Sequence, residues 1–137
     1  MHRLFLDASV LFTAAHNPEG KAHFLFELAA ALRPHWRLMS SGYAIEEARR
    51  NVTAKSPRSV SAFERLTSTL LVVAQPVAAG HSLDLPSKDQ PIWTAALAAG
   101  ATHLLTGDIR DFGRFMNRPE ATAGIVIQTV SEYLASV

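Results

Sequence analysis

Short apolar runs alternate with amphipathic stretches along the 137 residues of the chain. Runs that are continuously apolar and bounded by polar residues are typical of strands buried on both faces of a sheet. Stretches with apolar residues three and four positions apart are typical of helices. By these criteria we predict strands over residues 3–7, 36–40, 69–74, 103–106 and 124–128.

The predicted helices lie between these strands. Residues 21–33 have helical periodicity, and their apolar side is formed by Phe24, Leu25, Leu28 and Leu32. A second helix is predicted over residues 43–51. A third begins at Ser56 and Pro57, a hydroxyl cap followed by proline at the first helical position, and ends near Ser68.

Two further helices are marked by capping-box spacing, in which a hydroxyl residue precedes Glu or Gln by three positions. Ser87 and Gln90 have this spacing and open a predicted helix over residues 88–99, which Gly100 is suited to end. The closing helix begins at a second pair of this kind, Thr129 and Glu132.

Strands that alternate with helices predict an α/β fold with a parallel sheet covered by helices on both faces. Apolar residues make up 48% of the chain and charged residues 18%, which is typical of a compact core and not of a disordered chain. No repeat, low-complexity tract or linker interrupts the sequence, so we expect a single domain over residues 1–137.

The composition excludes several kinds of chemistry and location. The chain has no cysteine, which rules out a disulfide framework, a thiol nucleophile and a thiolate zinc site. Asp7 interrupts the first apolar run, which argues against a signal peptide. The apolar stretches also fall short of the ~20 residues of a membrane span. We therefore expect a cytoplasmic protein with no membrane partner.

Acidic residues recur where the predicted strands end. Asp7 ends the first strand, and Asp108 follows the end of the strand over 103–106 by two residues. Asp89 lies in the first turn of the helix before that strand, where a carboxylate is also simply favoured by the helix dipole. Because chemistry in open α/β sheets collects at the carboxyl ends of the strands, we expect these three acids to converge.

The predicted helix over residues 43–51 offers one more acid, Glu46 or Glu47. Its apolar residues define a stripe, and at ~100° per residue Glu47 lies nearer the edge of that stripe than Glu46 does. We therefore favour Glu47 as the inward carboxylate, although either could be an ordinary surface acid. Ser9 and Thr106 adjoin Asp7 and Asp108 and are candidates to hold those carboxylates in place.

A cluster of carboxylates implies a cation. Two of them ~4 Å apart repel by ~4 kcal/mol at an effective dielectric constant of 20. Such a cluster persists only if protons are retained or a cation neutralises it. Carboxylate oxygens without cysteine suit Mg²⁺ or Mn²⁺. A bound divalent ion activates water and stabilises a phosphoryl transition state, so we predict phosphodiester hydrolysis.

Three segments together, LFLDASVL, SGYAIEEARRN and KDQPIWTAALAAGATHLLTGDIRDF, resemble the PIN domain, a family of small metal-dependent ribonucleases. The resemblance implies a three-layer α/β/α sandwich with a mainly parallel sheet of about five strands. It implies that Mg²⁺ or Mn²⁺ is held by an acidic pocket and that RNA is the substrate. The implied catalytic and metal-binding residues are Asp7, Glu47, Asp89 and Asp108, with Asp111 as an auxiliary metal ligand.

Many members of this family are toxins of toxin–antitoxin pairs, so the resemblance also implies an antitoxin protein and a homodimer as candidate partners. The segment after Glu47 resembles a subgroup in which the helix glutamate is followed by Arg and Asn, which leaves the toxin function open. The net charge of +1 gives no global basic field. Local basic residues, which are also compatible with solvated helix faces, are the candidates for contacting RNA phosphates: Arg49, Arg50, Lys55, Arg58 and Arg110.

Two other functions remain open on the sequence alone. A PIN-like domain without catalysis could bind RNA or a protein through the same fold. An aspartyl-phosphate phosphatase or receiver domain also has an aspartate at a strand end, but the phosphatase motif requires a second aspartate where this chain has Ser9. A response of the melting temperature to Mn²⁺ would favour the enzyme.

Overall fold

The computed structural model describes residues 1–32, 35–77 and 80–137. Within them lies a five-stranded sheet in the order β3-β2-β1-β4-β5, in which all neighbouring strands are parallel. The strands are β1 His2–Leu6, β2 Trp36–Ser41, β3 Leu71–Val73, β4 His103–Leu105 and β5 Val126–Gln128. The predicted α/β fold with a parallel five-stranded sheet is confirmed.

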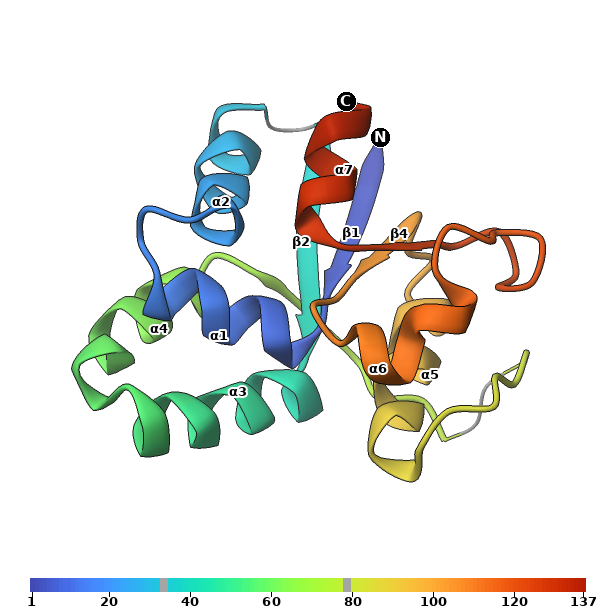
Figure 1. Cartoon of the computed structure of the whole chain (residues 1–137), viewed down its shortest axis with the longest axis horizontal. Coiled ribbons are helices and arrows are strands. Elements are labelled where there is room, and N and C mark those ends of the chain that lie inside the picture. Colours follow the sequence, from blue (N-terminus) through green and yellow to red (C-terminus); the bar gives the residue numbers. More distant parts are fainter. Residues whose placement is uncertain (33–34, 78–79) are drawn as a thin grey trace.

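Helices cover both faces of this sheet (Figure 1). One side carries α1 Ala8–His16, α2 Lys21–Ala31, α3 Gly42–Lys55, α4 Val60–Thr67 and α7 Val130–Ser136, and the other carries α5 Gln90–Ala98 and α6 Ile109–Phe112. Short 3₁₀ turns span Pro57–Ser59, Ser87–Asp89 and Gly113–Phe115. Across the described part of the chain, none of these helices combines the length and the apolar character needed to cross a membrane.

The strands divide the core into two apolar layers because successive side chains point to opposite faces of the sheet. Leu4 and Leu6 pack with the helices of the first side, whereas Phe5 between them packs with those of the second. Leu105 and Leu104 of β4 divide in the same way. This burial on both faces explains why the strands are continuously apolar and not alternating.

The strand order reverses between β1 and β4, and this reversal places the candidate site. The chain adds β2 and β3 on one side of β1 and then returns to place β4 on the other side. Asp7, directly after β1, donates its backbone N–H to the carbonyl of Leu105 at the end of β4, with 3.0 Å between N and O. The carboxyl ends of β1 and β4 therefore lie side by side at the point of reversal, which is where open α/β folds hold their ligands.

Helix α1 is absent from the sequence-based prediction, which leaves residues 8–20 unassigned. Asp7 caps this helix, because its side chain accepts a hydrogen bond from the backbone N–H of Ala8. The buried positions Ala8, Leu11 and Ala15 follow helical spacing. The signal for this helix was therefore present in the sequence, in the acidic residue that ends β1.

The predicted apolar side of α2 is half right. Leu25 is buried and Leu28 packs partly buried against the core, as predicted, but Phe24 and Leu32 are 48% and 39% exposed. The other buried side chains are Ala22, Phe26 and Ala29. The helix packs against α7 and β2, and small alanines on its inner side allow that approach while Phe26 fills the remaining space. The prediction extended the helix to Arg33, which lies outside the described residues.

The capping predictions have mixed outcomes. Thr129 and Glu132 form the predicted capping box, and Gly100 ends α5 with a positive φ of 69°. The box predicted for Ser87 and Gln90 is wrong. The Gln90 amide instead donates to the backbone carbonyls of Leu83 and Leu85, so it holds the preceding loop against the helix.

Three predicted strands are longer than the observed ones, and the run over residues 103–106 is longer by one residue only. The run over residues 69–74 forms a strand only over Leu71–Val73, because Thr69 and Leu70 still bond to the carbonyls at the end of α4. The run over residues 124–128 forms a strand only from Val126, because Ile125 closes a turn on the carbonyl of Thr122.

A cluster of aromatic and histidine rings closes the opposite, amino-terminal end of the sheet. The rings of His2 and Trp36 are stacked, and the ring of Tyr133 meets those of His2, Trp36 and His103 edge-on. His103 also shares a hydrogen bond with the hydroxyl of Thr102. Burial, with a smaller contribution from His2, lowers the pKa of His103 to about 4.

The lowered pKa of His103 predicts acid sensitivity between about pH 6.5 and pH 4. The unfolded chain binds the proton below its ordinary pKa of 6.5, while the folded protein resists protonation until about pH 4. The contribution of His103 to stability should therefore fall as the pH falls through this window and then level off. The partial exposure of the ring reduces the effect to the order of 1 kcal/mol, a few degrees of melting temperature.

Thermal unfolding across pH 4–7 measures this effect. His103→Gln should lose less stability on acidification than the wild type does, whereas substitution of the exposed His35 by Gln should follow the wild-type curve. If His103→Gln and the wild type show the same pH dependence, the assignment to His103 is refuted.

Candidate functional site

Asp7 is buried and held by donors on both sides of its carboxyl group. Its exposed fraction is 5%. One oxygen accepts from the backbone N–H of Ala8 at 2.7 Å, and the other accepts from the hydroxyls of Thr106 at 2.6 Å and Ser9 at 3.3 Å. Burial nevertheless raises the pKa of Asp7, and the charge of Asp108 adds to the rise. The carboxyl group is thus fixed in orientation at a cost in solvation.

The hydroxyls of Ser9 and Thr106 join the loops that follow β1 and β4. Besides donating to Asp7, Ser9 accepts from the backbone N–H of Gly107 at 2.9 Å. Thr106, which is fully buried, accepts from the backbone N–H of Asp108 at 2.9 Å. Both residues lie where the sequence analysis placed them, and each connects Asp7 to the loop that carries Asp108.

Three other carboxyl groups converge beside this pair of loops. Oxygen atoms of Asp89, Asp108 and Asp111 all lie within 4.8 Å of one another. Asp89 ends the 3₁₀ turn before α5 and is 5% exposed, while Asp108 caps α6 by accepting from the backbone N–H of Asp111 at 3.1 Å. Neighbouring strand ends and two short helical turns thus place acids from distant parts of the sequence in one cluster.

Asp89 and Asp111 have opposite pKa shifts although they face each other. Burial, followed by the hydrogen bond with Asp111, raises the pKa of Asp89 to about 6. The Lys88 ammonium holds the pKa of Asp111 below its usual value. In the absence of a metal ion, Asp89 is therefore the first of these two carboxyl groups to take up a proton as the pH falls towards 6, and Asp111 stays ionised.

The structure separates Glu47 from Glu46 on α3. Glu46 is exposed and pairs with Arg49 at 2.6 Å. Glu47 is partly buried, and its pKa is raised first by that burial and then by the charges of Asp7 and, to a smaller extent, Asp108. Glu47 therefore faces the acidic cluster, as the stripe argument predicts, and Glu46 faces away from it.

Lys88 is a feature of the site that sequence reasoning missed. Its ammonium nitrogen lies 2.8 Å from an oxygen of Asp111, 3.3 Å from Asp89 and 3.6 Å from Asp108. The hydrogen bond to Asp111 raises the pKa of Lys88, which stays charged. The only available signal was its place beside Asp89 in the sequence, which does not reveal where a long flexible side chain points.

Tyr43 connects α3 to the turn that carries Lys88 and Asp89. Its hydroxyl donates to the backbone carbonyl of Lys88 at 2.7 Å, while its ring remains 38% exposed. Burial, and then the charge of Glu47, raises the pKa of Tyr43. Sequence analysis did not single out this residue, because the contact joins segments 45 residues apart.

The basic residues predicted to contact RNA differ in their environments. The guanidinium of Arg49 binds Glu46 and Glu64 and lies over the ring of Phe63, so it would have to leave both glutamates to bind phosphate. Arg50 lies close enough to Glu47 to oppose the rise of its pKa. The other three are exposed: Lys55, Arg58 and Arg110.

A family model described as "PIN domain" matches residues 3–110 of the chain. These residues include all of β1 to β4 except the first position of β1, and they contain Asp7, Glu47, Asp89 and Asp108. No curated protein matches the chain.

Several solved structures share the fold at low sequence identity. A chain of VapBC2 from Rickettsia felis, bound to a DNA fragment from the promoter, has 17% identity and a TM-score of 0.67 over 93% of this chain and 98% of the other. DNA-bound VapBC from Salmonella typhimurium has 19% identity and a TM-score of 0.62 over 95% and 99%. The sarcin-ricin loop cleaving toxin VapC20 from Mycobacterium tuberculosis has 16% identity and a TM-score of 0.50 over 74% and 86%.

The support that Thr106 gives to two acids predicts a stability effect. Thr106→Val removes the hydroxyl at nearly constant volume and leaves a buried oxygen of Asp7 and the N–H of Asp108 without this partner. We expect a loss of roughly 1–3 kcal/mol, the cost of unsatisfied buried groups. Thr106→Ser keeps the hydroxyl and should lose about 1 kcal/mol or less for the missing methyl group. Urea unfolding compares the two, and equal stability of Thr106→Val and the wild type would contradict this role.

Proposed function

This chain belongs to the PIN domain family, and from that premise we propose that it is a metal-dependent endoribonuclease that hydrolyses RNA phosphodiester bonds. The observation that carries the proposal is the convergence of acids at the carboxyl ends of β1 and β4. Asp89, Asp108 and Asp111 present oxygens within 4.8 Å of one another, and Asp7 and Glu47 adjoin them. We assign the catalytic role to Asp7, Glu47, Asp89 and Asp108.

The donor set fits a hard divalent cation, which we propose to be Mg²⁺ or Mn²⁺. Every donor is a carboxylate oxygen, and the described residues bring no sulfur or imidazole into the cluster. Asp89, Asp108 and Asp111 would hold the ion, with Asp7 and Glu47 at its side. When bound, such an ion lowers the pKa of water and stabilises charge on a phosphoryl group.

The protein residues supply position and proton transfer. Asp7 is fixed by donors from Ala8, Ser9 and Thr106, so its carboxylate keeps one orientation without substrate. We assign the general base to Glu47, whose carboxylate would accept the proton of the attacking water. Its raised pKa makes it a better proton acceptor than an ordinary surface glutamate, provided that it is ionised.

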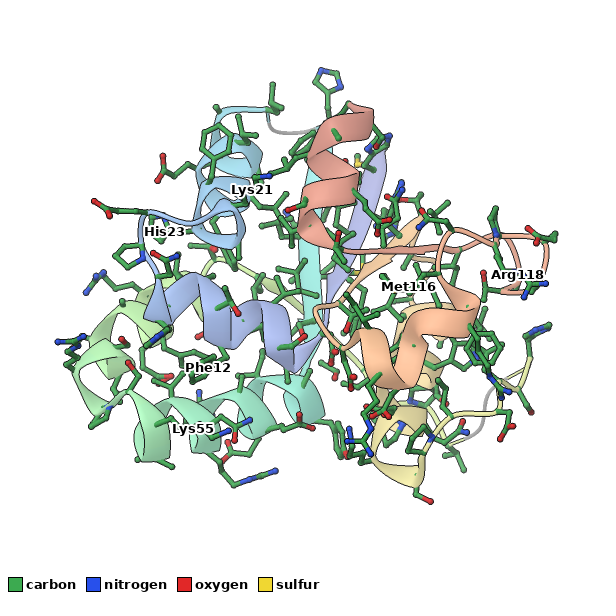
Figure 2. The ribbon with its side chains drawn as sticks, in the orientation of Figure 1. Phe12, Lys21, His23, Lys55, Met116 and Arg118 are labelled. Atoms are coloured by element: carbon green, nitrogen blue, oxygen red, sulfur yellow. The ribbon has the colours of Figure 1, made fainter. Side chains whose placement is uncertain are left out.

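We propose that exposed basic side chains position the RNA around this acidic cluster. Arg50, beside Glu47 on α3, and Arg110, in α6 between Asp108 and Asp111, are the nearest candidates. Lys55 ends α3 roughly 12 Å along the helix from Glu47, and Figure 2 shows it at the far end of α3, so it would reach phosphates further along the strand. Arg58 follows Lys55 by three residues in the chain. Arg49 would bind RNA only after its guanidinium had left Glu46 and Glu64.

The structural relatives support the substrate class and the partners of the proposal. One of them is a toxin that cleaves the sarcin-ricin loop, which supports RNA as the substrate. VapBC proteins recur among them, which supports a toxin function for this chain and an antitoxin protein as its partner. On the same ground we propose a homodimer in the cytoplasm as the working form.

The alternative functions are less well supported. Receiver domains have the strand order 2-1-3-4-5, whereas this sheet has the order β3-β2-β1-β4-β5. A module that only binds RNA or protein has no use for buried carboxyl groups that repel one another. The response to metal separates this second alternative from the enzyme.

The metal site predicts a thermal shift that depends on the acids. Mn²⁺ at 100 times its dissociation constant should stabilise the wild type by about 2.7 kcal/mol. Asp89→Asn and Asp7→Asn should lose most of this shift, and their metal-free forms should be at least as stable as the wild type because repulsion is reduced. Asp84→Asn, which changes an exposed acid paired with Arg114, is the matched control and should keep the shift. A wild type that does not respond to millimolar Mn²⁺ would refute the enzyme.

Neighbouring glutamates on α3 allow a matched test of catalysis. Glu47→Gln should slow cleavage of a labelled single-stranded RNA by roughly 10²–10⁴-fold, the usual contribution of a general base. Glu46→Gln should stay close to the wild type, because Glu46 faces away and only pairs with Arg49. Single-turnover rates in Mn²⁺ compare them. Loss of activity in Glu46→Gln alone would reverse the assignment, and wild-type rates in Asp89→Asn would contradict the whole site.

A further inference from the structure

Resting on the proposed metal site, we propose that the Lys88 ammonium is an internal counter-ion of the Asp89, Asp108 and Asp111 carboxylates. A divalent cation then binds these three residues by displacing the ammonium. Lys88 therefore stabilises the metal-free protein and lowers the affinity of the site for metal.

The position of the ammonium carries this inference. Its nitrogen lies 2.8, 3.3 and 3.6 Å from oxygens of Asp111, Asp89 and Asp108, the same carboxyl groups that lie within 4.8 Å of one another. No other lysine or arginine forms an ion pair with these three acids in residues 1–32, 35–77 and 80–137. The cation that neutralises the cluster is thus part of the chain itself.

A metal ion and this ammonium cannot occupy the cluster together. An Mg²⁺ ion held by all three carboxyl groups would need their oxygens at about 2.0–2.1 Å, whereas the ammonium nitrogen now lies 2.8–3.6 Å from oxygens of the same groups. Two cations in one cluster would also repel each other strongly. The ammonium must move before the ion can be held by all three residues.

The structure allows this movement because, in the described part of the chain, the Lys88 ammonium is held by the three acids alone, and the residue's other anchor is its backbone. Its carbonyl accepts the hydroxyl of Tyr43 at 2.7 Å, which ties the turn to α3. The side chain is 59% exposed, in contrast to 7% for Asp89. The four-carbon stem can therefore turn into solvent while the carboxylates stay in place, and no part of the fold has to open.

Removal of the charge at Lys88 should separate its two effects. In Lys88→Met the three carboxylates lose their counter-ion, so the metal-free melting temperature should fall below that of the wild type. The same variant should bind Mn²⁺ roughly tenfold more tightly or better, because the ion no longer has to displace a cation. Free Mn²⁺ is measured directly by electron paramagnetic resonance during titration of the protein, with no RNA and no activity assay.

The control variants change the charge of the side chain and its position in the protein independently. Lys88→Gln repeats the loss of charge with a polar side chain, and Lys88→Arg keeps the charge and should keep the wild-type affinity. Lys21→Met removes the same charge from an exposed lysine on α2 (Figure 2) and should change neither quantity.

The outcomes separate the inference from the function on which it rests. If the wild type binds Mn²⁺ but Lys88→Met and Lys88→Gln bind it no more tightly, the role of Lys88 is overturned. The proposed nuclease function then still stands. An equal gain of affinity in Lys88→Arg also overturns it, because the charge would not be the cause. If the wild type and the Asp89→Asn variant bind Mn²⁺ equally weakly, the proposed function itself is contradicted.

Discussion

The rest of this structure depends on how repulsion among carboxyl groups at one sheet edge is offset. A pair of carboxylates ~4 Å apart costs ~4 kcal/mol at an effective dielectric constant of 20, against a stability of ~5–15 kcal/mol for a whole domain. The protein uses two means: hydrogen bonds to Asp7 and the ammonium of Lys88. The strand reversal between β1 and β4 makes the first of these possible, because it brings Thr106 against Asp7.

The parts of the fold that follow from burial could be predicted from the sequence. The central strands β1 and β4 are covered on both faces, so their apolar runs are easily recognised. Helix α1 was missed because Asp7 was considered only as a site residue, although it is both the cap and the acid. The predicted inner side of α2 was only half right because Phe24 and Phe26 both compete for burial, and only the packing partners decide between them.

The residues of the site likewise fall into those that could be predicted from the sequence and those that could not. The acids could be placed because strand ends meet at one edge, and helical geometry separates Glu47 from Glu46. Their individual roles remain predictions. The contacts of Lys88 and Tyr43 could not be predicted, because each joins segments that are distant in the sequence through a long side chain.

In the proposed nuclease, the acidic cluster links metal binding to RNA binding. Among the described residues, the acidic cluster combines five carboxyl groups with the one ammonium of Lys88. Without a metal ion, this cluster therefore repels phosphates. In the proposed nuclease, the exposed basic side chains would hold an RNA strand nearby without neutralising the centre of the cluster. A divalent ion brings twice the charge of the ammonium that it displaces, so metal and RNA should favour each other's binding. A domain that only binds RNA would bear the repulsion among these carboxyl groups without gaining a catalytic metal ion from them. The arrangement is therefore better explained by catalysis than by binding alone.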